Sequence, residues 1–157
     1  MQPSVSQQQW IKRFLFVLAL LPLARVIWMG FHDRLGANPI EYITRASGDW
    51  TLYFLCLTLA ITPSRKLTGH VWLLKLRRML GLFAFFYATL HWLAYAWLDQ
   101  GLVLHELLAD VAKRPFILVG TAAWLAMLPL ALTSFNAAIR WLGGRAWRDL
   151  HKVTYAL

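Results

Sequence analysis

The chain has 157 residues, of which 59% are hydrophobic, with nine tryptophans and one cysteine. This composition is untypical of soluble domains, and the lone Cys56 excludes an intrachain disulfide and any multi-cysteine zinc or iron–sulfur site. The net charge of +9 is concentrated in particular joins between apolar runs. That distribution follows the positive-inside rule of membrane proteins and does not form the basic stripe expected for nucleic-acid binding.

The apolar runs predict an all-α, polytopic transmembrane helical bundle that forms a single domain over residues 1–157. A membrane-spanning helix needs roughly 20 apolar residues. Four complete spans are predicted, at about residues 12–30, 48–62, 80–98 and 116–133. A fifth span begins at residues 147–157, so we expect the domain to be incomplete at its C-terminus.

Charge predicts the orientation of these spans. The join at residues 63–79 carries five basic residues and no acid, whereas the joins at 31–47 and 99–115 carry both signs. We therefore expect the 63–79 join and the N-terminus to be cytoplasmic. Pro63 and Pro115 are expected at helix edges, while Pro22 and Pro129 fall inside spans.

His91 is the first candidate for chemistry, because it lies near the middle of the third span. Ionisable groups at that depth are costly and usually functional. Its helical neighbours Tyr87, Ala88, Ala94 and Tyr95 are small or flat, which suits a planar macrocycle and equally suits close helix packing. From the residues alone, a metal ligand or proton relay and a merely hydrogen-bonded histidine are both open.

His151 is the second candidate, four residues into the fifth span. Helical rise places His91 about 16 Å and His151 about 6 Å from the cytoplasmic side, so the two are not expected to share one iron. An interfacial histidine without a ligand role is the alternative for His151.

Three arginines are candidates for binding a cofactor's anionic groups. Arg25 lies inside the first span and could pair with a haem propionate, or extend towards the interface near Trp28. Arg77 and Arg78 begin the third span and could meet a propionate or a flavin phosphate. Ordinary positive-inside anchoring explains that pair as well.

Eight short motifs in this order and spacing resemble the bacterial MsrQ (YedZ) family. The resemblance covers essentially the whole chain. The motifs are Leu21–Arg25, Leu35–Pro39, Ile61–Pro63, Leu76–Leu82, Tyr87–His91, Lys113–Pro115, Pro129–Ser134 and Trp147–Tyr155. This family belongs to the ferric-reductase-like transmembrane superfamily and is related to the membrane part of NADPH oxidases.

The resemblance implies a b-type haem protein of the bacterial inner membrane that transfers electrons and is not itself the catalytic subunit. Electrons would come from the quinone pool or a flavin reductase. They would pass to a periplasmic molybdopterin methionine sulfoxide reductase that repairs oxidised proteins.

The resemblance also implies the cofactors and their ligands. His91 and His151 match the family's haem-ligand positions, for one or two haems. A further ligand histidine and a sixth span of the family would fall beyond Leu157. FMN is implied as well, without residues to hold it. Tyr87, Trp92 and Tyr95 are expected to pack around the haem ring.

Two other classes of protein stay open. A proton-coupled small-molecule transporter would also place histidine and arginine in spans, but transporters usually show repeated halves, which this sequence lacks. A membrane anchor or assembly subunit without redox activity would keep its absorbance unchanged when His91 is replaced.

Overall fold

The computed structural model describes residues 3–155, which are helical with short connections and contain no strand. The long helices are α1 (Val5–Phe31), α2 (Pro39–Thr68), α3 (Leu74–Leu93) and α5 (Pro115–Leu132). The short α-helices are α4 (Leu104–Lys113), α6 (Asn136–Leu142) and α7 (Gly144–Leu150). A 3-10 helix, η1 (Val71–Leu73), precedes α3, and a π-helix, η2 (Ala94–Asp99), follows it. A second 3-10 helix, η3 (His151–Tyr155), follows α7.

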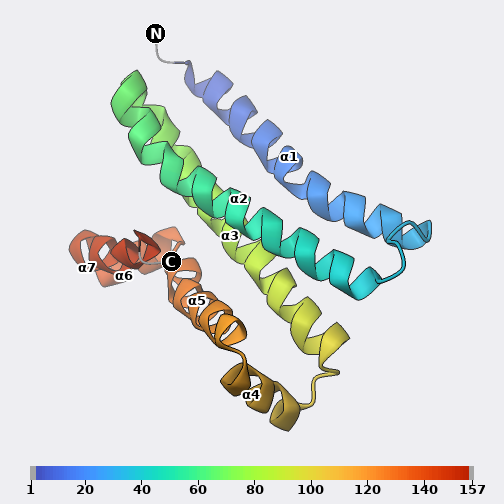
Figure 1. Cartoon of the computed structure of the whole chain (residues 1–157). Helices are drawn as coiled ribbons and strands as arrows, with labels where there is room; N and C mark the ends of the chain where they lie inside the picture. Colours follow the sequence, from blue (N-terminus) through green and yellow to red (C-terminus); the bar gives the residue numbers. More distant parts are fainter. Residues whose placement is uncertain (1–2, 156–157) are drawn as a thin grey trace.

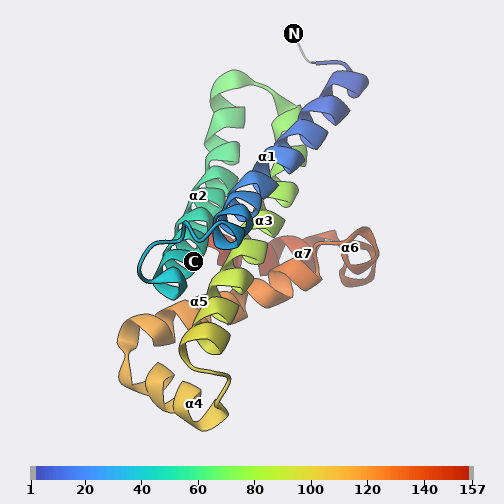
Figure 2. The same ribbon diagram turned by 90° about the vertical axis from the view of Figure 1, so that its right-hand side faces the viewer.

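The bundle is built around α3. Helix α2 runs antiparallel along α3, α1 lies beside this pair, and α5 packs on α3 (Figures 1 and 2). Aromatic rings fill the centre where α2 meets α3: Phe54 stacks on Phe83 and on Tyr87, with ring centroids 5.5 and 5.3 Å apart. The all-helical bundle expected from the sequence is confirmed.

The ends of the helices follow from local chemistry. Ser4 and Gln7 form a reciprocal capping box at the start of α1, and Asn38 caps α2 directly before Pro39. Helix α2 ends at Gly69, whose φ of 71° lies in the left-handed region that glycine adopts without strain. Pro115 begins α5, as predicted.

The prediction that Pro63 lies at a helix edge is wrong, because α2 continues through it to Thr68. Because Pro63 has no backbone N–H, one hydrogen bond of α2 is missing close to the C-terminal end of the helix. There, the basic side chains of Arg65 and Lys66 interact favourably with the negative end of the helix dipole.

Within residues 3–155, three segments are long and apolar enough to cross a membrane: α1, the segment Val71–Asp99 and α5. They correspond to the predicted first, third and fourth spans. Helix α2 is 30 residues long but is not among them, because its sequence is less apolar than that of the other three. Crossing by the predicted second span, 48–62, therefore stays a prediction.

The predicted start of a fifth span, at residues 147–157, stays a prediction. In place of a continuous helix from Trp147, the chain forms the seven-residue α7 and then the 3-10 helix η3, and residues 156–157 lie outside the described part. Gly143, with a φ of 77°, separates α6 from α7. Both short helices lie across the end of α5 at a large angle to the long helices (Figure 1).

Candidate functional site

His91 is held by the backbone of α2. Its Nδ1 lies 2.8 Å from the carbonyl oxygen of Thr44, which also accepts a hydrogen bond of 3.0 Å from the Ser47 hydroxyl. A carbonyl only accepts hydrogen bonds, so Nδ1 must carry the proton. In the neutral ring the lone pair is then on Nε2, which has no hydrogen-bond partner among residues 3–155. This arrangement prepares Nε2 for a metal.

Gly48 lets the His91 ring lie directly against α2. A Cβ atom added at Gly48 would lie 3.1 Å from both Cε1 and Nδ1 of His91. That is closer than nine in ten real Cβ contacts, so with a larger residue the ring would have to shift by a few tenths of an ångström. The close approach expected near His91 therefore depends on a glycine of the neighbouring helix, besides the alanines of α3.

His151 shows the same pattern within its own segment. Its Nδ1 lies 3.0 Å from the carbonyl oxygen of Trp147, and its ring stacks on the Trp147 indole at a centroid distance of 4.0 Å. Its Nε2 lies 3.4 Å from the hydroxyl oxygen of Ser134, which donates its own proton to the carbonyl of Leu130 at 2.6 Å. With Nδ1 protonated, the lone pair is on Nε2, which receives no proton from the Ser134 hydroxyl.

His151 faces a cavity of about 400 Å³ between α2, α3, α5 and the segment after α7. The lining is apolar except for a few polar groups and a set of cations. These cations are Arg77, Arg78, Arg148 and Lys152. Within the described residues the lining contains no aspartate or glutamate. The cavity therefore combines an apolar interior, an imidazole and positive charge, which suits an apolar ligand with anionic substituents.

Burial lowers the pKa of the His151 imidazole, and the nearby Arg77 charge lowers it further, although hydrogen bonds to backbone carbonyls oppose this change. The ring is therefore neutral at pH 7, which is the form that binds metals.

The two histidines lie at different depths. His151 is close enough to Arg77 to feel its charge, and both line the same cavity. Arg77 precedes His91 by 14 residues of α3, about 21 Å of helix axis. The structure thus agrees with the expectation that one iron is not shared between His91 and His151.

The three candidate arginines differ in position. Arg77 and Arg78 line the cavity, where Arg77 donates a hydrogen bond of 3.2 Å to the Thr62 hydroxyl and Arg78 one of 2.7 Å to the side-chain oxygen Oδ1 of Asn136. Arg25 is exposed on α1 and lines neither this cavity nor a second one, an apolar space of about 270 Å³ between α1, α2 and α3. The geometry supports an anion-binding role for the first pair and not for Arg25.

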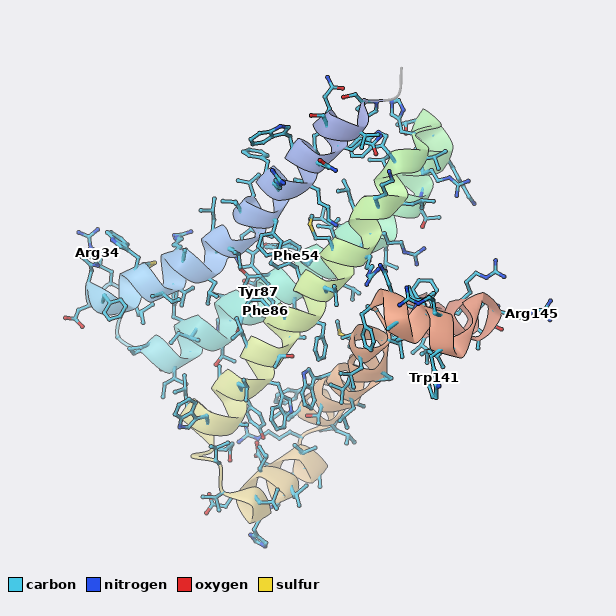
Figure 3. The ribbon with its side chains drawn as sticks, turned by 180° about the vertical axis from the view of Figure 1, so that it is seen from behind. Arg34, Phe54, Phe86, Tyr87, Trp141 and Arg145 are labelled. Atoms are coloured by element: carbon cyan, nitrogen blue, oxygen red, sulfur yellow. The ribbon has the colours of Figure 1, made fainter. Side chains whose placement is uncertain are left out.

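The expectation that Tyr87, Trp92 and Tyr95 pack around a haem ring stays a prediction. Each contacts a different helix: Tyr87 bonds to the backbone of α1, Trp92 stacks on Trp124 of α5, and Tyr95 donates to Asp110 of α4. Figure 3 shows Tyr87 close to Phe54 in the interior of the bundle. Successive aromatic residues on a helix project in different directions, and here three neighbouring helices are available to receive them.

Sequence reasoning missed Thr44, Gly48 and Ser134, which orient or face the two histidines. Thr44 acts through its backbone carbonyl, which any residue carries, so no side-chain pattern could identify it. Gly48 offered a signal, because a glycine in a helix interior costs stability and often marks a close approach.

A family model and the most similar relatives agree on one protein family. The family model described as ferric reductase like transmembrane component matches residues 47–157. Two bacterial proteins named protein-methionine-sulfoxide reductase heme-binding subunit MsrQ are similar over nearly the whole chain. That of Herminiimonas arsenicoxydans is 54% identical over 99% of this chain and 71% of its own length. That of Azospira oryzae is 55% identical over 99% of this chain and 67% of its own length.

A third relative has a different name and size. The magnetosome protein MamZ of Magnetospirillum gryphiswaldense is 42% identical over 98% of this chain, which corresponds to 24% of that longer protein. No solved structure matches the chain significantly.

Proposed function

Because this chain belongs to the MsrQ family of ferric-reductase-like transmembrane proteins, we propose that it is a haem-binding electron-transfer subunit of a methionine sulfoxide reductase system. In this role the chain positions a redox cofactor inside the membrane, and the reduction of methionine sulfoxide takes place on a partner protein. The names of the relatives support a role in a methionine sulfoxide reductase system. The two histidines support the way in which we propose that haem is bound.

One observation carries the proposal: both His91 and His151 tie Nδ1 to a backbone carbonyl and leave Nε2 without a proton donor. Histidines that bind metals usually have the second ring nitrogen fixed in this way, which sets the tautomer and the ring orientation. Bound haem supplies an iron that takes up and releases single electrons, at a potential set by its axial ligands and its surroundings.

We propose that the cavity beside His151 holds one b-type haem, which its apolar walls and cationic lining support. Nε2 of His151 would be an axial ligand, and the apolar walls would hold the ring away from water. Arg77, Arg78, Arg148 and Lys152 would pair with the propionates, as carboxylates pair with guanidinium and ammonium groups. No covalent attachment to the chain is needed for this arrangement.

His91 would be an axial ligand of a second haem, because about 21 Å of helix axis separates it from the level of Arg77. The family resemblance implies a further ligand histidine outside these 157 residues. Two haems at two depths would let electrons cross the membrane in two steps. We also propose FMN as a cofactor, as the family resemblance implies, without assigning residues to it.

We propose an inner-membrane location with the N-terminus in the cytoplasm. The basic residues of the α2–α3 join support this orientation. The start of α1 is at the same end, since the Lys75 ammonium donates a hydrogen bond of 2.8 Å to the Gln8 side chain. Helix α2 would cross with α3, beside which it runs (Figure 1).

In this orientation His151 lies nearer the cytoplasm and His91 nearer the periplasm. Electrons would enter from the quinone pool or a cytosolic flavin reductase and leave to a periplasmic molybdopterin methionine sulfoxide reductase. The order of the two histidines between the basic end and the opposite end supports this direction.

The test is the dithionite-reduced minus oxidised absorbance spectrum of the complete purified protein, together with its haem content. Two b-type haems are expected, with one lost in His91→Ala and one in His151→Ala while the amount of inserted protein stays similar. Full haem content in both variants would overturn the ligand assignment. A complete protein without any haem signal would favour a transporter or a membrane anchor.

A further inference from the structure

Helix α4 joins two apolar segments that are long enough to cross the membrane, Val71–Asp99 and α5. It therefore lies at a membrane boundary, at the end of the bundle opposite the basic α2–α3 join (Figures 1 and 2). A ten-residue helix at this position can lie on the membrane surface, although it is too short to cross the bilayer.

The helix is amphipathic. At 100° per residue, Leu104, Leu107, Leu108 and Val111 lie on one side, and His105, Glu106 and Lys113 lie towards the other. Only part of the apolar side of α4 is covered by the rest of the protein. Leu107 is buried, whereas Leu104 and Leu108 are 67% and 61% exposed.

Polar contacts fix how α4 is turned. The Tyr95 hydroxyl in η2 donates a hydrogen bond of 2.8 Å to Asp110, and the Arg114 guanidinium pairs with the other oxygen of that carboxylate at 2.8 Å. Asp110 thus links α4 to the end of the preceding membrane segment and to the residue that precedes α5. With this link and Leu107 in place, Leu104 and Leu108 cannot turn inwards.

Further apolar residues are exposed in the segments that flank α4. Leu102 lies in the loop before α4, and Phe116 and Val119 lie in the first turns of α5; all three are more than half exposed. Because α5 crosses the membrane, its exposed apolar residues face lipid. Leu104 and Leu108 extend this surface at the boundary between acyl chains and headgroups.

We propose that α4 is an in-plane interfacial helix whose Leu104–Leu108 edge is inserted into the outer leaflet of the lipid bilayer. This places Glu106 and Lys113 in the headgroup and water layer. Lipid contact then stabilises the connection between η2 and α5, and so the end of the bundle from which electrons leave. The inference depends on membrane insertion of the chain and not on haem binding.

The test uses single cysteines labelled with an environment-sensitive NBD dye in the complete protein, with Cys56→Ala as the background. The labelled variants are Leu108→Cys and Leu104→Cys on the apolar edge, with Glu106→Cys as the matched control on the polar side. Each protein is reconstituted into vesicles of phosphatidylethanolamine and phosphatidylglycerol. Quenching is measured with aqueous iodide and with lipids that carry a nitroxide on the acyl chain.

We expect blue-shifted emission, strong quenching by the nitroxide lipids and weak quenching by iodide at Leu108 and Leu104. The Glu106 label should show the reverse. Quenching by iodide at Leu108 and Leu104 as strong as at Glu106 would overturn the proposal and leave the edge free in water for a protein partner. Resistance of both apolar labels to both quenchers would overturn it as well, since protein would then cover the edge. Two apolar positions keep the test decisive if one variant fails to insert.

Discussion

The hydroxyl of Tyr87 donates a 2.7 Å hydrogen bond to the backbone carbonyl of Ala19, three residues before Pro22 in α1. The same hydroxyl accepts a 3.2 Å bond from the amide of Leu23. In a regular helix the Leu23 amide and the Ala19 carbonyl would bond to each other. One side chain of α3 therefore bridges α1 where its proline disturbs the ladder of hydrogen bonds, as occurs for prolines in membrane helices.

Tyr87→Phe should destabilise the bundle without removing haem. The ring and its stacking on Phe54 remain, while the two hydrogen bonds of the hydroxyl to α1 are lost, at a cost of roughly 1–2 kcal/mol. Thermal unfolding in detergent measures the loss, with Tyr53→Phe as control because Tyr53 is exposed on α2. An unchanged stability would contradict the bridging role, and a changed haem spectrum in the folded protein would contradict the separation of Tyr87 from the cofactor.

Gly48→Ala should disturb the haem bound by His91 and spare the other one. The added methyl group would meet the imidazole at 3.1 Å and force it to tilt or withdraw from the Thr44 carbonyl. Electron paramagnetic resonance of the two low-spin haems, with total haem content, measures this change.

Gly120→Ala is the matched control, since a Cβ atom at that position of α5 meets nothing within 4 Å. We expect no change in its spectrum. Two unchanged haem signals in Gly48→Ala would show that the contact with α2 does not set the orientation of His91.

Arg77→Gln should lower the midpoint potential of the haem next to His151. Removing a nearby positive charge disfavours the reduced state, with a shift on the order of tens of millivolts. Arg77→Lys keeps the charge and should restore most of the potential. Arg145→Gln is the control, because Arg145 lies at the outer end of the short helices, away from the bundle (Figure 3). Equal midpoint potentials in Arg77→Gln, Arg77→Lys and Arg145→Gln would show that Arg77 does not lie next to the haem.

Asp110→Asn should loosen α4. The amide cannot pair with the Arg114 guanidinium as the carboxylate does, so the link from Tyr95 to the start of α5 weakens. Hydrogen exchange of the α4 amides in the reconstituted protein should become faster. Glu106→Gln, an exposed acid on the same helix, should leave the exchange unchanged. Equal exchange in all three proteins would show that Leu107 alone holds the helix.

Much of the fold could be predicted because lipid requires long apolar helices, and these are visible in the sequence as runs of residues. The first, third and fourth spans were found on this basis. The end of α2 was not, because Pro63 suggested a boundary while Gly69 and the preceding basic residues determine it. The short helices α6 and α7 depend on the turn at Gly143, which periodicity did not reveal.

The candidate site could be predicted only in part. His91 and His151 stood out because a titratable ring in an apolar run is costly. Their tautomers depend on the carbonyls of Thr44 and Trp147, one of which belongs to another helix. The directions of Tyr87, Trp92 and Tyr95 could not be predicted for the same reason, since neighbouring helices determine which way an aromatic side chain packs.

The carbonyl that orients His91 belongs to another helix, whereas the one that orients His151 belongs to its own segment. The two rings therefore respond differently when helices move against each other. The Nδ1 of His151 bonds to a carbonyl four residues earlier in its own segment, so that ring keeps its orientation when the segment moves as a unit. The Nδ1 of His91 bonds across to α2, so its orientation changes whenever α2 slides or tilts against α3. Bilayer thickness and lateral pressure act on helix tilt. The membrane itself is therefore expected to tune the outer redox centre while the inner one keeps a constant geometry.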